Sequence, residues 1–201
     1  MPDELIASYR ARESLLEDLR ANLERETCDA LDGVPHIDRI SFRVKQAASF
    51  AEKVQDRRVE PPYTDPLVEV EDQVAGRVIV FFLTDLEVVS EKLKGTFNTV
   101  ERKHHRPPKD QEFGYESWHL ICVIPPQCFP NGWQGRDDVP QTFELQLRTI
   151  FMHAYAEPNH DLGYKATSDL KPEHRRELAW VAASAWGADR ALLRVCEQMK
   201  S

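Results

Sequence analysis

The segment from Thr142 to Arg148 alternates polar and apolar side chains without a break. Because successive side chains of a strand point to opposite faces, this pattern predicts a β-strand with one face in an apolar core. The other face then presents a carboxylate, an amide and a guanidinium about 6–7 Å apart, from Glu144, Gln146 and Arg148. Such a row can be the solvated face of an antiparallel sheet or part of a binding site, and the strand alone leaves both open.

Other segments predict a sheet surrounded by helices. The strand-like runs lie at 37–44, 77–83, 97–100 and 118–124, the helical patterns at 3–26, 47–55, 85–94, 150–163 and 172–199, and the polar loops at 102–112 and 125–140. The run from Arg77 to Leu83 is apolar at nearly every position, and Thr84 with Glu87 forms a capping-box pattern after it. This order of elements predicts an α+β fold with a mixed, mainly antiparallel sheet of about five strands flanked by helices.

The composition limits the class of protein. With 201 residues, of which 41% are apolar, the chain is expected to form one domain, with an N-terminal helix in 1–36, a central region in 37–166 and a C-terminal helix in 167–201. Its 34 acidic and 26 basic residues disfavour a protein that coats nucleic acid through bulk charge, although a local basic groove stays possible. We find no pattern of a membrane span or a signal peptide, and the four scattered cysteines are typical of reduced thiols, so a cytoplasmic protein is expected.

Basic side chains gather where the first predicted strand passes into a helix. Arg43 and Lys45 share one face of the strand, and Ser49 and Lys53 lie four residues apart on the helix that follows. These groups could converge on a polyphosphate, because Arg binds phosphate in a bidentate way and Lys acts as a mobile point charge. The backbone N–H groups of the helix start near Gln46 would add donors. The alternative is a solvated basic strip.

An acidic pair precedes the predicted buried strand. Asp72, with Glu71 beside it, is placed just before Gly76. Magnesium is usually held by one or two carboxylates together with substrate phosphates, so an acid close to phosphate-binding bases is a natural Mg²⁺ ligand. A Glu-Asp pair is equally common on ordinary surfaces.

The segment from Gly114 to His119 places three polar side chains on one strand face. Tyr115 could stack on a base, and His119 could bind phosphate or organise a site. The alternatives are a packed surface aromatic residue and a hydrogen-bonded histidine at the edge of the core.

Taken in order, these pieces resemble the synthetase domain of the RelA/SpoT homology family, over roughly residues 37–166. The matching text is Arg43-Val-Lys45-Gln-Ala-Ala-Ser49, Lys53, Asp72-Gln-Val-Ala-Gly76-Arg77, Gly114-Tyr115-Glu-Ser117-Trp-His119, Glu144-Leu-Gln146-Leu-Arg148-Thr149 and a tail from His160 to Lys165. Each motif is short, but five of them in the family's order are specific.

The resemblance implies a nucleotidyltransferase-like synthetase fold and a pyrophosphokinase, which moves the β,γ-diphosphate of ATP to the 3′-hydroxyl of GDP or GTP. It also implies a role for each matching residue. The ATP-binding residues would be Arg43, Lys45, Ser49, Lys53 and Arg77; the Mg²⁺ ligands Asp72 and Glu144; the catalytic residues Glu144, Asp72 and Gln146, with Glu144 as the base; and the acceptor-binding residues Tyr115, His119, Arg148 and Lys109.

The chain departs from the family before Gly114, where Phe113 stands at a position that is often Asn. The acceptor therefore stays open between a guanine nucleotide, an adenine nucleotide and the 3′ end of tRNA, the last as a toxin paired with an antitoxin protein. The basic patch Arg102 to Arg106 with Lys109 could serve acceptor phosphates in each case, or be a solvated loop. A catalytically silent nucleotide-binding regulator is a further alternative. The resemblance implies a small synthetase without hydrolase or regulatory domains, and possible homo-oligomers.

Overall fold

The computed structural model describes residues 2–56, 61–107, 109, 112–114, 116–166 and 170–200. Its centre is one sheet of five strands in the order β1-β2-β5-β4-β3. The strands are β1 (Ile37–Val44), β2 (Val74–Val80), β5 (Thr142–Thr149), β4 (Ser117–Val123) and β3 (Thr99–His105). Strands β2 and β5 run parallel and the other neighbours antiparallel, which confirms a mixed, mainly antiparallel sheet.

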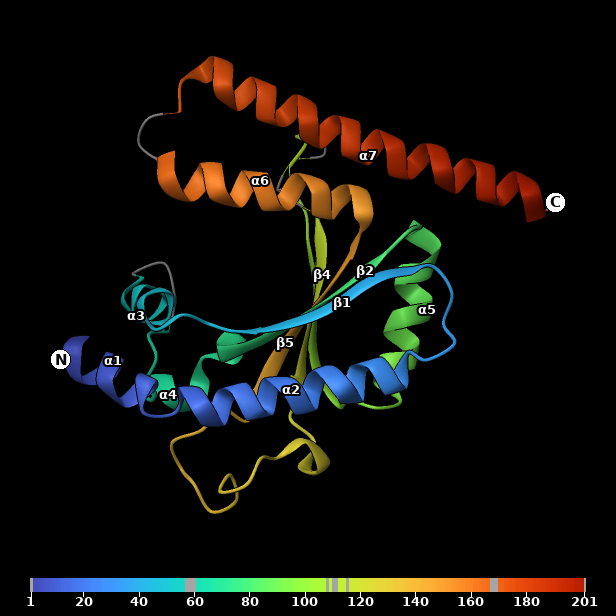
Figure 1. Ribbon diagram of the computed structural model, residues 1–201. Coiled ribbons are helices and arrows are strands. Elements are labelled where there is room, and N and C mark those ends of the chain that lie inside the picture. Colours follow the sequence, from blue (N-terminus) through green and yellow to red (C-terminus); the bar gives the residue numbers. More distant parts are fainter. Residues whose placement is uncertain are drawn as a thin grey trace.

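Helices lie on both sides of this sheet. They are α1 (Pro2–Arg10), α2 (Glu13–Ala30), α3 (Ala47–Gln55), the short α4 (Pro66–Glu69), α5 (Leu83–Lys94), α6 (Ile150–Ala166) and α7 (Pro172–Lys200). Figure 1 shows α2 along one side of the sheet and α6 on the other, with α7 stacked on α6. Two 3₁₀ turns, η1 (Glu71–Gln73) and η2 (Pro126–Cys128), complete the described elements.

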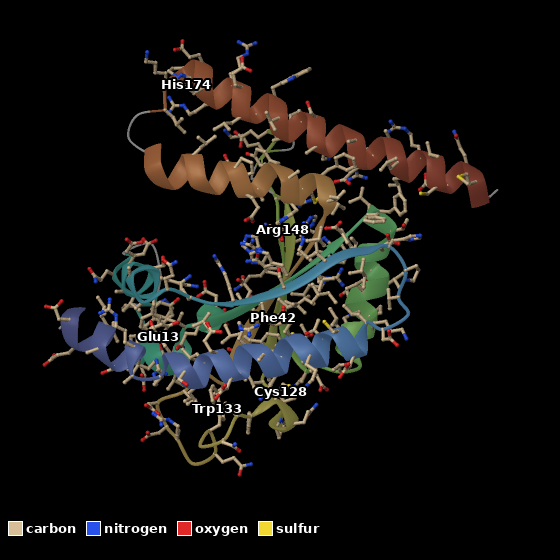
Figure 2. All side chains as sticks on the ribbon, in the orientation of Figure 1. Glu13, Phe42, Cys128, Trp133, Arg148 and His174 are labelled. Atoms are coloured by element: carbon tan, nitrogen blue, oxygen red, sulfur yellow. The ribbon has the colours of Figure 1, made fainter. Side chains whose placement is uncertain are left out.

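The apolar core fills the space between the sheet and the helices α2 and α5. Phe42 lies on the α2 side of the sheet and Arg148 on the α6 side (Figure 2). At Gly76 a β-carbon would come within 2.4 Å of the Phe42 ring and 2.6 Å of a Leu145 methyl group, so glycine is required for the strand to pass beneath these side chains. The buried residues of this core include Leu16, Leu19, Leu23, Phe42, Val78, Leu120, Phe143, Leu145 and Leu147.

The predicted helix at 3–26 is wrong in one respect, because it is broken at Ala11 and Arg12. The Arg12 side chain is buried and donates to Leu67 O (3.3 Å), to Gln73 Oε1 (3.3 Å) and to Asp138 O. The sequence pattern did not show this break, because it is fixed by contacts with residues far along the chain.

The predicted buried strand is shifted by three residues. It starts at Val74 and ends at Val80, so that α5 begins at Leu83. The first turn of α5 is closed by Asp85, whose carboxylate accepts the Phe82 N–H (3.1 Å), and not by the Thr84 and Glu87 pair. Two phenylalanines after the strand made the apolar run longer than the strand itself.

The predicted short strand at 97–100 and the predicted loop from 102 are also corrected, since β3 spans Thr99–His105. Its polar side chains concealed it, but its backbone pairs with β4 over the whole length. It is an edge strand, and charged residues are common there because they discourage further strand pairing. Arg102 also stacks on Trp118, with the guanidinium carbon 3.9 Å from the ring centroid.

Among the residues that the structure describes, we found no helix of the length and apolar character needed to cross a lipid bilayer.

Candidate functional site

The sheet face opposite α2, here called the polar face, carries polar side chains from all five strands. The pairing register places the residues of this face in rows across the sheet, among them a few apolar residues. The first row is Arg43, Ala75, Glu144, Ile121 and Glu101, and the second row is Ser41, Arg77, Gln146, His119 and Lys103.

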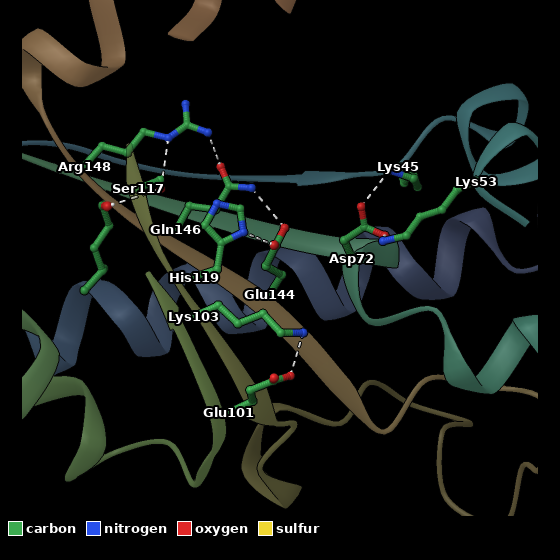
Figure 3. A network of polar contacts seen from close by, with 11 residues as sticks. Lys45, Lys53, Asp72, Glu101, Lys103, Ser117, His119, Glu144, Gln146 and Arg148 are labelled. Carbon is green, nitrogen blue, oxygen red and sulfur yellow. Dashed lines mark hydrogen bonds and ion pairs between the residues drawn. The ribbon is translucent and has the colours of Figure 1, made fainter. Parts of the chain in front are cut away.

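The predicted row on β5 is a continuous chain of hydrogen bonds. Arg148 Nη2 donates to Gln146 Oε1 (2.6 Å), and Gln146 Nε2 donates to Glu144 Oε2 (2.9 Å). The other oxygen of Glu144 accepts from His119 Nδ1, because an ionised carboxylate can only accept. Figure 3 shows these four side chains in line across β4 and β5. Their orientations are therefore fixed by one another before any ligand binds.

Asp72 lies near Glu144 without a hydrogen bond to it and pairs with two ammonium groups. Lys45 Nζ donates to Asp72 Oδ2 (2.7 Å) and Lys53 Nζ to Asp72 Oδ1 (2.8 Å). The Lys45 backbone is also anchored, because Tyr9 donates its hydroxyl to Lys45 O (2.7 Å) and stacks on Phe50 of α3. The turn η1 thus presents Asp72 to a strand and a helix that both carry positive charge.

The two acids are close neighbours. Glu144 pairs in the sheet with Ala75, three residues after Asp72, and Figure 3 shows their carboxylates at the same end of the polar face. Burial alone would raise the pKa of Glu144, but the hydrogen bonds from His119 and Gln146 outweigh burial and lower it, although the nearby charge of Asp72 opposes them. Burial would likewise raise the pKa of Asp72, and Lys45 and Lys53 lower it. Both acids are therefore anionic at neutral pH.

This donor set suits a magnesium ion that is shared with a polyphosphate. Within the described part of the chain, no three His, Cys, Asp or Glu side chains gather closely enough to hold a metal by themselves. Two adjacent carboxylates are nevertheless the protein contribution that Mg²⁺ usually has when phosphates supply the remaining ligands. Asp72 and Glu144 would be those ligands.

The remaining predicted site residues fall into two groups. Arg43 and Arg77 are on the polar face, and Ser49 lies one turn before Lys53 on α3. Lys109 is exposed and pairs with Glu112 (3.0 Å). Tyr115 lies outside the described residues.

One residue beside the polar face was missed by the sequence patterns, and a second, His105, was named there only as part of the basic patch. Glu157 of α6 pairs with Arg77 (2.7 Å) and reaches Arg148 (3.4 Å). The ring of His105 lies 4.1 Å from that of His119, and burial together with the charge of His119 lowers the pKa of His105. The sequence pattern predicted a loop for the basic patch, and recognising the polar strand β3 would have put His105 on the same face as Lys103.

Comparison with known proteins adds the family. A model described as "Region found in RelA / SpoT proteins" matches residues 42–169. The chain is 27% identical over 187 residues to GTP pyrophosphokinase YjbM of Bacillus subtilis (strain 168), which covers 90% of this chain and 82% of that protein. The crystal structure of small alarmone synthetase 1 from Bacillus subtilis superposes with a TM-score of 0.72 at 24% identity and covers 98% of this chain and 97% of that chain. A second structure of that synthetase, bound to its product pppGpp, gives a TM-score of 0.71 at 22% identity, with 99% and 98% covered.

Proposed function

The chain belongs to the RelA/SpoT family, and we propose that it is a pyrophosphokinase that transfers the β,γ-diphosphate of ATP to the 3′-hydroxyl of GDP or GTP. The observation that carries the proposal is the juxtaposition of Asp72 and Glu144 beside Lys45 and Lys53 on a preorganised polar face. Transfer of a phosphoryl-type group depends mainly on positioning and on neutralising charge, and this arrangement offers both.

The cations would bind the triphosphate. Lys45 directly follows β1, which carries Arg43, and Lys53 lies on α3 one turn after Ser49. Arg43 is exposed, and among the described residues it has no hydrogen-bond or ion-pair partner, so its guanidinium is available to a ligand. When phosphate oxygens replace Asp72 as partners of the two lysines, the Asp72 carboxylate becomes available to a metal ion.

Glu144 is the proposed general base. The 3′-oxygen of the acceptor attacks the β-phosphorus of ATP, its proton passes to Glu144, and the bond from the β-phosphorus to the oxygen that bridges it to the α-phosphorus breaks, so that AMP leaves with that oxygen. A positioned base typically contributes about 10²–10⁴-fold to a rate. Because His119 and Gln146 occupy both oxygens of Glu144, they aim the carboxylate and keep it ionised.

Magnesium, held by Asp72 and Glu144 together with the phosphates, would neutralise charge that develops on the transferred group. Gln146 and Arg148 extend the hydrogen-bond chain that orients Glu144. Because the Arg148 side chain is only 5% exposed, we propose that it acts by holding Gln146 in place.

A guanine nucleotide is the acceptor that the comparisons favour. The relative YjbM is named a GTP pyrophosphokinase, and the product in the related synthetase structure is pppGpp. We infer a reaction in the cytoplasm, where both nucleotides are available. An adenine nucleotide and the tRNA 3′ end, the latter with an antitoxin partner, are the competing acceptors.

Incubation of the purified protein with γ-³²P-ATP, Mg²⁺ and one acceptor at a time tests the proposal. The acceptors are GDP, GTP, AMP, ADP and deacylated tRNA, and we expect label in GDP and GTP. Label in an adenine nucleotide or in tRNA would replace the acceptor while keeping the chemistry. Transfer to none of them would refute the enzymatic proposal and favour a silent nucleotide-binding regulator.

A further inference from the structure

One carboxylate oxygen on α6 lies within 4 Å of nitrogen atoms from three basic side chains. Oε1 of Glu157 lies 2.7 Å from Arg77 Nη1, 3.4 Å from Arg148 Nη1 and 3.8 Å from His153 Nδ1. Arg77 and Arg148 come from the neighbouring parallel strands β2 and β5, and His153 comes from the preceding turn of α6. Glu157 therefore lies where the helix meets the polar face and neutralises charge that these elements bring together.

The two arginines depend on Glu157 to different degrees. Arg148 is also held by Gln146 Oε1 (2.6 Å) and by Ser117 Oγ (3.4 Å). Within the described part of the chain, Arg77 has Glu157 as its one ion-pair partner, and its side chain is 22% exposed against 5% for Arg148. Loss of Glu157 should therefore release Arg77 and leave Arg148 largely in place.

The other groups around this oxygen are basic, so none of them can replace Glu157 as the anionic partner of Arg77. Arg148 and His153 lie around the same oxygen, and Arg39 is close enough to act on His153. Burial would raise the pKa of Glu157, but Arg77 outweighs it and keeps the carboxylate ionised. Without that negative charge, the guanidinium of Arg77 would be pushed away from Arg148 and would have many rotamers to explore.

We propose that Glu157 is a positioning residue that holds the Arg77 guanidinium in the orientation needed to contact the bound ATP. The inference rests on the proposed function and on the ATP-binding role that the family resemblance implies for Arg77, and it assigns to Glu157 no contact with the nucleotide. A planar guanidinium binds phosphate edge-on and a base face-on, and each mode requires a defined orientation of the plane. Glu157 fixes that plane in advance, so less conformational freedom is lost when ATP binds.

The test is Glu157→Gln, which keeps the shape and removes the charge. We expect the KM for ATP to rise about 3- to 10-fold with kcat within twofold of the wild type, because binding is weakened and Glu144 is untouched; a tenfold change corresponds to about 1.4 kcal/mol. Binding of α,β-methylene-ATP, measured by calorimetry, should weaken by the same factor. Glu157→Asp keeps the charge on a shorter side chain, so its KM for ATP should fall between those of the wild type and Glu157→Gln.

A second comparison asks whether Glu157 acts through Arg77. In Arg77→Gln the partner of Glu157 is lost, so adding Glu157→Gln to it should change the KM for ATP by less than twofold. Glu91→Gln is the matched control, since Glu91 is a half-exposed helix glutamate that pairs with Lys94 on its own helix α5. It should leave both kinetic constants unchanged, and thermal melting checks that all variants are folded.

Three results would overturn the inference. They are unchanged ATP affinity in Glu157→Gln, tighter ATP binding, which would mean that Glu157 competes with the nucleotide, and additive effects in the double variant. Analogue binding and acceptor labelling by the wild-type protein show whether the inference alone or the proposed function as a whole is wrong. If wild type neither binds the analogue nor labels any acceptor, the proposed function is wrong; if it does both and Glu157→Gln matches it, only the inference is wrong.

Discussion

At the scale of single residues, the site depends on the Glu144 carboxylate, whose two oxygens are held in place by hydrogen bonds from His119 and Gln146. We predict that Glu144→Gln lowers kcat about 10²–10⁴-fold, because the amide cannot take the acceptor proton and is a poorer ligand for Mg²⁺. Initial rates of label transfer measure the effect. The KM for ATP should change much less, since the lysines that grip the phosphates remain in place.

The melting temperature of Glu144→Gln is the control for this prediction. Glu144 is part of a buried hydrogen-bond chain, so its loss could also loosen the polar face. Glutamine keeps the shape, and a melting temperature within a few degrees of wild type would confine the effect to chemistry. A Glu144→Gln protein with nearly full kcat would exclude Glu144 as the base.

Most of the site is visible residue by residue in the sequence, for a simple geometric reason. A strand puts every second side chain on one face, so Glu144, Gln146 and Arg148 had to be neighbours. The bond between His119 and Glu144 follows only from the register of β4 and β5, and the pairing of Asp72 with Lys45 and Lys53 only from the packing of η1 and α3 at the end of β1. Glu157 could not be found at all, because nothing in its local pattern indicates which strand face α6 will cover.

At the scale of elements, α7 is tied to the rest of the protein by a buried acid. Asp189 of α7 is 2% exposed, and one of its oxygens accepts from Thr149 Oγ1 (2.7 Å) at the junction of β5 and α6. Its other oxygen, Oδ1, is buried and has no hydrogen-bond partner within the described part of the chain. Burial raises the pKa of Asp189 from 3.8 to about 6, against the hydrogen bond from Thr149 and with a contribution from Glu116.

This buried acid gives a pH-dependent prediction. The folded pKa is raised, so the folded state binds more protons than the unfolded state between pH 3.8 and about 6, and stability from this group falls as pH rises through that window. Asp189→Asn removes the titration and keeps an acceptor for Thr149. The melting temperature of Asp189→Asn minus that of wild type should therefore increase between pH 3.8 and about 6 and level off above it.

Melting curves of both proteins over that range measure this difference. Taking the difference matters because Asp72, Glu144 and Glu157 have lowered pKa values and act in the opposite direction in both proteins. A difference that stays constant with pH would show that Asp189 does not titrate in this window.

The same scale shows which elements the sequence could predict. Strands β1 and β5 and helix α3 agree with their patterns, because each has one apolar and one polar side that local periodicity reveals. Strand β3 and the break between α1 and α2 do not, because backbone pairing with β4 and the burial of Arg12 are tertiary effects. Tertiary contacts override local preference most easily at edges and helix ends, where packing is weakest.

At the scale of the whole molecule, the acids of the site are stabilised by the protein itself. Asp72 has two lysine partners and Glu144 has His119 and Gln146, so the nucleotide-free fold does not need a metal to balance these charges. We therefore predict that chelation by EDTA leaves the melting temperature of the nucleotide-free protein unchanged and abolishes diphosphate transfer.

Nucleotide binding, unlike the nucleotide-free fold, should depend on the metal. When the triphosphate pairs with Lys45 and Lys53 in place of Asp72, the two carboxylates of the site would face the phosphates without a counter-charge. Magnesium then becomes necessary for the complex. At 100 times its Kd, a ligand that binds only the folded state stabilises by about 2.7 kcal/mol, which for a domain of this size is roughly 5–11 °C in Tm. We expect that shift with α,β-methylene-ATP plus Mg²⁺ and little of it with either alone. If the analogue stabilised the protein equally in EDTA, Asp72 and Glu144 would not be metal ligands, and if EDTA alone lowered the Tm, the fold would contain a structural metal that these ion pairs do not explain.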